Sequence, residues 1–218
     1  MPANVGFVLF GLTGGLASGK SSVAARWNVR GLAIIDADVM AREIVAPGTS
    51  GLAEIVSVFG PQMVLADGSL DRKKIAAVVF ADAEARKKLE LITHPRIAAA
   101  MLKRAGELEA ADEPLGCYEA ALLVERGFAD LCRPLVVVAA DEPTQVARAM
   151  ARDHLTEQEV RARLSAQLPL ASKVAAADYV IDNNGDVDAL RSKADDVLDA
   201  ICQQQGVDPA RYPKRGRA

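Results

Sequence analysis

The chain has 218 residues, of which 50% are hydrophobic and 25% are charged, and its formal net charge is −3. This composition is typical of a globular protein with one compact core, and the acidic balance argues against a general nucleic-acid binder. No apolar run approaches the roughly 18 residues of a membrane span, and the first residues lack the pattern of a secretory signal peptide.

The cysteines Cys117, Cys132 and Cys202 are widely spaced and form no CxxC motif. Such cysteines are typical of reduced thiols in a cytoplasmic protein. Neither His94 nor His154 lies at a zinc-finger spacing from them, so we do not expect a thiolate metal site.

The chain begins with two predicted strands. Residues 5–12, VGFVLFGL, are a fully apolar run that ends in glycines, which favours a buried parallel strand. Residues 32–38, LAIIDAD, predict a second strand that ends in Asp36 and Asp38. A spacing of two places both carboxylates on the same side of a strand that stays extended.

A helical insertion is expected after the second strand, over residues 39–113. Its alanine-rich helical patterns are separated by the turn signals APGTSG, FGPQ and ADGSL. Pro95 predicts that one helix ends near Thr93 and that another starts at Pro95. The apolar stripe along this segment is interpreted as the insertion's own core; it comprises Leu89, Ile92, Ile97 and Met101.

Strands return in the second half of the chain. The runs LGCYEAALLV, PLVVVAA and ADYVID predict three of them, and residues 144–168 between the last two are helical and charged. Asp186 is expected to cap a final helix. The alternation predicts an α/β fold with a doubly wound, parallel, five-stranded sheet. The expected core comprises 1–38, 114–148 and 176–218, the insertion 39–113, and a lid 149–175.

Residues 14–21, GGLASGKS, match the phosphate-loop pattern GxxxxGK[ST] between a strand and a helix. Glycines let the backbone curl so that its N–H groups point at phosphate oxygens. Lys20 supplies a cation at the β and γ phosphates, and the Ser21 hydroxyl can ligate Mg²⁺. The residues expected to hold ATP in this segment are Gly15, Leu16, Ala17, Ser18, Gly19, Lys20, Ser21 and Ser22.

Other phosphate-loop classes fit the sequence less well. A guanine-nucleotide switch needs an NKxD base reader, and no Asn in the chain is followed by Lys. The run VVVAADE resembles the acidic strand end of a motor ATPase. However, Pro143 directly after it favours a strand followed by a helix cap.

A small-molecule kinase accounts for more of the pattern. Asp36 and Asp38 supply carboxylates beside the loop, and the insertion supplies room for an acceptor. Arginines on two helices joined by a turn form a plausible lid over the transferring phosphoryl group; they are Arg148, Arg152, Arg161 and Arg163. For Arg161, an ordinary solvated helix face is the favoured interpretation.

The motifs together resemble the dephospho-CoA kinase family, from about Phe7 to Ala200. They occur in the order LTGGLASGKSSVA, IIDADVMAREIVAPG, DGSLDRKKIAAVVFAD, LITHPRI, ALLVE, RAMARD, RLSAQ and ADYVIDNNG. The resemblance implies an enzyme with a core, an all-helical CoA-binding domain and a lid. It also implies transfer of the γ-phosphate of ATP, with Mg²⁺, to the ribose 3′-hydroxyl of dephospho-CoA, the last step of CoA synthesis.

The resemblance also implies roles for single residues. Asp38 matches the general base, and Lys20 and Arg148 join it as catalytic residues. Arg148 and Arg152 match lid arginines at the nucleotide, and Asn183 of DNNG matches a loop near the adenine. The acceptor side comprises Thr13, Asp38, Arg42, His94 and Leu122. His94 has an alternative role in bonding the backbone at a helix break, and for Glu125 a metal-site role and a surface cap both stay open.

Two segments depart from the family pattern. Ala17 stands where the loop usually has a third glycine, so that position must tolerate a Cβ atom. The family's DVPLL appears as EAALL, with Glu119 in place of the acid and Ala121 in place of the proline. The family's proline is interpreted as stiffening the acceptor wall, so this departure concerns acceptor fit rather than chemistry.

Two other functions remain as alternatives: a kinase for another small acceptor, such as a nucleoside monophosphate or a sugar acid, and a non-catalytic nucleotide sensor. The leading interpretation is a cytoplasmic, monomeric enzyme that binds ATP and dephospho-CoA. It predicts no nucleic-acid partner and no membrane association.

Overall fold

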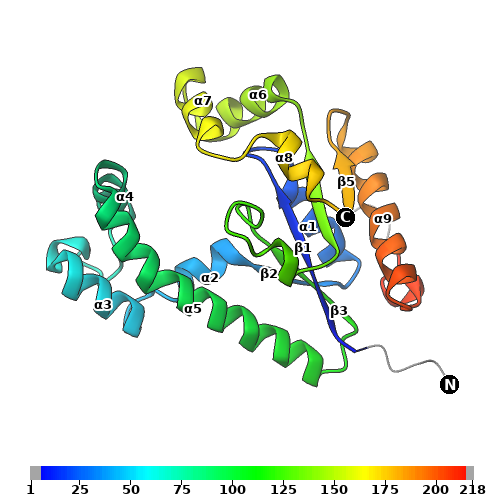
Figure 1. Ribbon diagram of the computed structural model, residues 1–218, viewed down its shortest axis with the longest axis horizontal. Helices are drawn as coiled ribbons and strands as arrows, with labels where there is room; N and C mark the ends of the chain where they lie inside the picture. The colour runs from blue at the N-terminus through cyan, green and yellow to red at the C-terminus, as the bar shows by residue number, and fades with distance from the viewer. Residues whose placement is uncertain (1–5, 215–218) are drawn as a thin grey trace. The chain divides into compact units, whose positions relative to one another are not determined.

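The computed structural model describes residues 6–214, and five strands form one sheet in the order β2-β3-β1-β4-β5 (Figure 1). The central strand β1 pairs in parallel with both β3 and β4, and β4 pairs in parallel with β5. The five strands are β1 (Val8–Gly14), β2 (Ala33–Asp36), β3 (Leu115–Glu119), β4 (Leu135–Ala139) and β5 (Tyr179–Asp182). The predicted five-stranded α/β fold is confirmed.

The strand order reverses direction at β1, because β2 and β3 lie to one side of it and β4 and β5 to the other. In an open parallel sheet, ligands bind outside the carboxyl ends of the strands at such a switch point. The segment that leaves β1 there is the predicted phosphate loop. The topology therefore places the loop where a doubly wound sheet binds ligands.

Helices fill the connections between the strands, and α9 follows the last strand. The α-helices are α1 (Lys20–Val29), α2 (Ala37–Glu43), α3 (Ser50–Phe59), α4 (Arg72–Ala81), α5 (Ala83–Ala110), α6 (Glu142–Asp153), α7 (Glu157–Ser165), α8 (Leu170–Ala175) and α9 (Val187–Gln204). Within residues 6–214, three short 3₁₀ turns accompany them: η1 (Pro61–Met63), η2 (Ala129–Leu131) and η3 (Pro209–Arg211). Asp186 caps α9 as predicted, by accepting a hydrogen bond from the N–H of Ala189.

The described chain divides into two compact units. The first comprises the residues up to Ile35 and those from Glu107 onward, and the second comprises Asp36–Gly106. Each is described by itself below.

The core of the first unit lies between the sheet and the helices α1 and α9, which pack against each other (Figure 1). Trp27 of α1 is fully buried and meets the ring of Phe10 edge-on, with centroids 5.5 Å apart. Its indole N–H donates to the Ala194 carbonyl of α9 at 2.8 Å, so the ring is buried without losing its hydrogen bond. This contact fixes α1, and with it the helix end that follows the phosphate loop.

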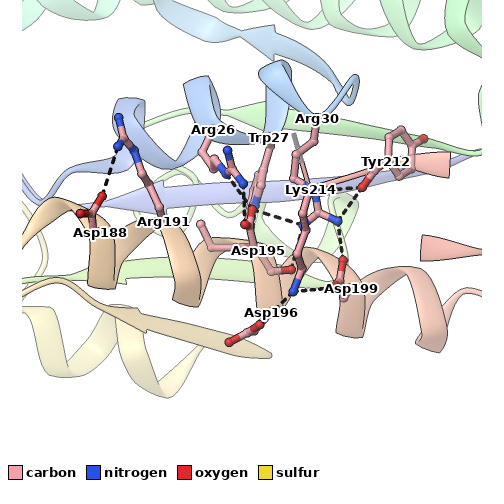
Figure 2. Close-up of polar contacts among 11 residues, drawn as sticks. Arg26, Trp27, Arg30, Asp188, Arg191, Asp195, Asp196, Asp199, Tyr212 and Lys214 are labelled. Atoms are coloured by element: carbon pink, nitrogen blue, oxygen red, sulfur yellow. Dashed lines mark hydrogen bonds and ion pairs between the residues drawn. The ribbon is translucent and has the colours of Figure 1, made fainter. Parts of the chain in front are cut away.

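A buried arginine ties the C-terminal segment to this core (Figure 2). Arg30 is 1% exposed, and its guanidinium donates to the Tyr212 carbonyl at 2.9 and 2.6 Å. It also pairs with Asp195 and Asp199 of α9, and Asp199 in turn pairs with Lys214 at 3.0 Å. A buried charge is tolerated only when it is paired and hydrogen-bonded, as it is here.

The second unit has its own small core. Its buried members are Val45, Ile55, Met63, Ile75 and Ile92, and Leu89 packs against them. The predicted apolar stripe therefore contributes to this core through Leu89 and Ile92.

The predicted helix break at Pro95 is wrong, because α5 runs without interruption from Ala83 to Ala110. Proline removes one helical N–H, and the carbonyl that loses its partner belongs to Leu91, a residue that is 75% exposed. The Thr93 hydroxyl and the Arg96 guanidinium donate to backbone carbonyls one turn earlier, at 2.9 and 2.7 Å. The bond lost to Pro95 therefore falls on the exposed side of α5, while Ile92 packs in the core of the unit.

Candidate functional site

The phosphate loop links β1 directly to α1. A Cβ atom on Gly14 would lie 2.7 Å from the Val138 carbonyl oxygen, so only glycine fits there. Gly19 has a φ of 95° and precedes the first residue of α1, Lys20. No side chain in residues 6–214 caps this helix, so its first N–H groups are open to an anion.

Ala17 adopts the left-handed backbone conformation, with a φ of 53°. An L-residue pays about 1–2 kcal/mol for that conformation, which glycine avoids. The side chain packs on a small apolar cluster formed by Val146, Ala149 and Val160. The loop thus keeps the left-handed turn at this position although the glycine is missing.

Glu119, the last residue of β3, joins the two loop residues that carry the predicted chemistry. Its Oε1 atom lies 2.6 Å from Lys20 Nζ and accepts a hydrogen bond from Ser21 Oγ at 3.1 Å. The Glu119 residue is 4% exposed and the Lys20 side chain 12%. A hydroxyl and a carboxylate are the hard oxygen donors that Mg²⁺ prefers, so this pair fits a magnesium ion bound with the phosphates.

Asn183, which follows β5, contacts the later part of the loop. Its Nδ2 group donates to the Ser18 carbonyl at 2.7 Å, and its own backbone N–H donates to the Ala139 carbonyl at 2.7 Å. Arg148 of α6 donates to the Asn183 carbonyl at 3.0 Å. The structure thus brings Asn183 and Arg148 together with the phosphate loop.

A cavity of about 500 Å³ opens beside the earlier part of the loop. Its walls come from Gly15, from α6, α7 and α8, and from the segment that joins α7 to α8. The lining residues are Gly15, Ala140, Glu142, Gln145, Arg161, Leu164, Ser165, Gln167, Leu168, Pro169, Leu170 and Lys173. Leu16 N–H donates to the Gln167 side chain at 3.1 Å, so this segment touches the loop directly.

The turn that follows β3 is held from two sides. The Ala121 carbonyl accepts hydrogen bonds from Thr13 Oγ1 at 3.1 Å and from Lys173 Nζ at 3.2 Å. Lys173 also pairs with Glu125 at 2.6 Å, and the two side chains are 1% and 15% exposed. Glu125 is therefore the partner of a buried lysine, and Leu122 lies half-buried in the same turn.

The other predicted lid arginines do not reach the loop in this structure. Arg152 is bonded to its neighbour Asp153 at 2.8 and 2.9 Å, and this bond raises the pKa of Arg152. Arg161 pairs with Glu142 and Glu157 on an exposed helix face, as the favoured interpretation expected. Ser22 and Arg163 are exposed.

The acids after β4 serve as a helix cap rather than as a motor-type acid pair. Asp141 is the N-cap of α6 and accepts a hydrogen bond from the Thr144 N–H at 2.9 Å. Hydrogen bonding with the Thr144 side chain, and then with its backbone, lowers the pKa of Asp141. Pro143 follows in the first turn of the helix, as predicted.

Asp36 and Asp38 do not share a strand face, which corrects the prediction from their spacing. β2 ends at Asp36, and Asp38 already lies in the first turn of α2. The Asp36 carboxylate accepts from the N–H groups of Asp38 and Val39, at 2.7 and 3.3 Å. Because Asp is a strong N-cap residue, it ends the strand and starts the helix at once.

The remaining acceptor-side residues lie in the second unit with Asp38. Arg42 is exposed in the last turn of α2, and His94 is half-buried inside the continuous helix α5. Thr13, Leu122 and the phosphate loop lie in the first unit. The expected site residues are thus divided between the two units.

Glu119, Gln167 and Lys173 are the site residues that sequence reasoning did not assign. Glu119 could have been recognised from the sequence, because it is an acid at the carboxyl end of a predicted strand, and that strand lies next to β1. Gln167 and Lys173 lie in and just after a short connection between helices. The motif RLSAQ ends in Gln167, but it gave that residue no role, because only the fold brings the connection back to the loop.

Comparison with known proteins adds to this geometry. The sequence model of the dephospho-CoA kinase family matches residues 8–189. A dephospho-CoA kinase of Geobacter sulfurreducens is 46% identical over 189 residues, 87% of this chain and 96% of that protein. One from Anaeromyxobacter dehalogenans is 47% identical over 190 residues, covering 87% and 90%.

A solved structure, the dephospho-CoA kinase from Campylobacter jejuni, is 29% identical, with a TM-score of 0.68. The alignment covers 89% of this chain and 97% of that one. By sequence and by fold, the chain belongs to the dephospho-CoA kinase family.

Proposed function

We propose that this protein transfers the γ-phosphate of ATP to the ribose 3′-hydroxyl of dephospho-CoA, giving CoA and ADP. One observation carries the proposal: the buried carboxylate of Glu119 contacts both Lys20 and Ser21 at the phosphate loop. The chain that contains this loop belongs to the dephospho-CoA kinase family. This arrangement prepares a cation and a metal-binding hydroxyl for the phosphates of a nucleotide.

The residues of the first unit would bind the nucleotide. The open N–H groups of the loop and of the α1 terminus hold the phosphates, and Lys20 neutralises charge at the β and γ positions. Mg²⁺, held through Ser21 with Glu119 beside it, would supply further positive charge at the phosphates. Asn183 would lie near the adenine, since it contacts the later part of the loop, and Arg148, which donates to the Asn183 carbonyl, would contribute positive charge to the bound nucleotide.

The residues of the second unit would bind the acceptor. Asp38 would accept or orient the proton of the attacking hydroxyl, with Arg42 and His94 beside the acceptor. The transition state of phosphoryl transfer is loose, so correct placement and electrostatic stabilisation contribute most of the rate. The lid would close over the nucleotide, because water at the γ-phosphate would hydrolyse ATP. On closure, Arg152 would turn from Asp153 toward the phosphoryl group.

The proposed partners are therefore ATP, Mg²⁺ and dephospho-CoA, in a cytoplasmic monomer. Among residues 6–214, no helix combines the length and the apolar character needed to cross a bilayer.

Acceptor profiling tests the proposal. Purified protein is given ATP and Mg²⁺ with dephospho-CoA, AMP, adenosine or shikimate, and ADP release is followed. Turnover on dephospho-CoA well above every rival supports the proposal. Preference for a rival would reassign the acceptor, and tight ATP binding without turnover on any acceptor would favour a nucleotide sensor.

A further inference from the structure

The segment that joins α7 to α8 makes a direct bond to the phosphate loop. Within this segment, 166–169, Gln167 is half-buried, and its Oε1 atom accepts a hydrogen bond from the Leu16 N–H at 3.1 Å. Leu16 is one of the four variable loop residues between Gly14 and Gly19. A side chain that binds the backbone of this loop is in a position to act on what the loop binds.

A buried ion pair fixes this segment to the core. Lys173, on α8, pairs with Glu125 at 2.6 Å and donates to the Ala121 carbonyl at 3.2 Å. The Leu168 N–H donates to the same Glu125 oxygen at 3.3 Å. Gln167 is therefore followed at once by a residue that is held in place, so its position beside the loop is set by the fold.

The other end of the Gln167 carboxamide is open to a ligand. Gln167 lines the cavity beside Gly15, and its Nε2 group makes no hydrogen bond to any part of the chain that the structure describes. With Oε1 engaged at Leu16, this N–H₂ group is a donor next to the loop. A phosphate oxygen is the natural acceptor for a donor at such a site.

The two ends of the loop indicate which phosphate this would be. Asn183 contacts Ser18, in the later part of the loop, and Gln167 contacts Leu16, in the earlier part. If the base lies toward Asn183, as in the proposed function, the phosphate chain runs away from it, and its terminal phosphate lies toward Gln167.

We propose that Gln167 is a specificity-determining residue that distinguishes ATP from ADP by donating a hydrogen bond from Nε2 to the γ-phosphate. Its Oε1 atom stays on the Leu16 N–H, so one side chain supports the loop and contacts the phosphate that is transferred. The inference rests on the proposed function in taking ATP as the nucleotide and in placing its base toward Asn183.

Binding measurements on Gln167 variants test this inference. Calorimetry with Mg²⁺ gives the dissociation constants of ADP and of the non-hydrolysable β,γ-imido analogue of ATP. Gln167→Glu keeps an acceptor for Leu16 but replaces the donor with a negative charge. Gln167→Met fills a similar volume with neither bond, and serves if the first variant does not fold. Gln158→Glu, on the exposed face of α7, is the matched control for the added charge.

The two nucleotides should respond differently. A lost bond to a charged group typically weakens binding about tenfold or more, so Gln167→Glu should weaken the ATP analogue by that factor and ADP by less than about threefold. Gln167→Met should also weaken the ATP analogue more than ADP, and Gln158→Glu should change neither. Equal weakening of both nucleotides, or no change in either, would overturn the inference.

These affinities decide the role of Gln167 independently of turnover. If the wild-type protein bound the ATP analogue but did not phosphorylate dephospho-CoA, the proposed acceptor would be wrong, while the comparison of ATP analogue and ADP would still be decisive for Gln167.

Discussion

Lys20 Nζ lies 2.6 Å from Glu119 Oε1, although the two residues are 99 positions apart in the sequence. The pair joins the phosphate loop to the neighbouring strand β3, and the carboxylate also binds Ser21. Both side chains are largely buried, so their attraction is screened little by solvent. The pair therefore holds the lysine and the hydroxyl in position at the phosphate loop.

Replacing Glu119 with Gln should remove most of the activity. The change keeps the size of the side chain but leaves Lys20 without its counter-charge and removes a carboxylate beside the metal site. We expect kcat to fall on the order of 100-fold, the size typical for loss of one electrostatic group in an active site, with a higher Mg²⁺ requirement. The control is Glu113→Gln, which alters a surface pair with Arg211. Steady-state rates are measured at several Mg²⁺ concentrations. An unchanged kcat in Glu119→Gln would exclude a role for the Glu119 carboxylate in catalysis.

Asp38→Asn should lose most of its turnover while ATP binding survives. Asparagine can still occupy the first turn of α2 but cannot accept a proton, and a general base contributes about 10²–10⁴-fold. Turnover and calorimetric ATP binding are compared in the same preparation. Asp112→Asn is a suitable control, since asparagine tolerates the left-handed conformation that Asp112 adopts at a φ of 55°. Retained turnover in Asp38→Asn would rule out its role as the base.

Arg30→Met should destabilise the fold by about 3 kcal/mol, because removing one partner of a buried ionic network leaves uncompensated charge. The variant removes the guanidinium that bonds the Tyr212 carbonyl and the Asp199 carboxylate (Figure 2). Urea unfolding gives the free energy. Arg191→Met, which loses only an exposed pair with Asp188, should cost less than about 1 kcal/mol. An equal loss of unfolding free energy in the two variants would mean that the buried network of Arg30 stabilises the fold no more than an exposed ion pair.

The same network predicts an acid dependence of stability. Burial alone would raise the pKa of Asp199, but hydrogen bonds from Arg30 and Lys214 outweigh it and hold that pKa below its ordinary value. A lowered folded-state pKa stabilises the protein above the unfolded-state pKa of about 3.9, and this stabilisation is lost as the pH falls below it. The free energy of unfolding should therefore fall as the pH decreases from about 5 through the folded-state pKa of Asp199, and less steeply in Arg30→Met. Parallel pH profiles for the two proteins would contradict this assignment.

The cysteines should be inert in the folded protein. Cys117, Cys132 and Cys202 are all buried free thiols. Burial raises the pKa of Cys132 and of Cys202 to about 11 each, and burial followed by the charge of Glu119 raises that of Cys117 well above its ordinary value. Since the thiolate is the reactive form, iodoacetamide at about pH 8 should label none of them until denaturant is added. Mass spectrometry counts the labels, and rapid labelling of the native protein would show that a thiol is accessible.

Local sequence signals predicted the parts of the fold that local chemistry determines. The glycines at 14 and 19 are required by a close approach and by a positive φ, and both are visible as a motif. Asp186 caps α9 through its own side chain. The parallel sheet follows from short apolar runs that alternate with helical patterns.

The errors arose where a tertiary contact or a second local signal prevailed. Pro95 suggested a break, but α5 is continuous, with Ile92 packed in the core of its unit. The spacing of Asp36 and Asp38 suggested a strand, but capping by Asp36 starts a helix between them. Residues such as Glu119 and Gln167 meet the loop only because the strand order and the α7–α8 connection return to it.

The position of the new phosphate in the product tests the central claim most directly. The protein is incubated with ATP, Mg²⁺ and dephospho-CoA, and the product is examined by phosphorus NMR before and after treatment with a 3′-nucleotidase. The account predicts one new monoester phosphate on the ribose 3′-oxygen, removed completely by the nucleotidase, with one ADP formed for each. A phosphate at any other oxygen, or ADP formed without a phosphorylated acceptor, would contradict it.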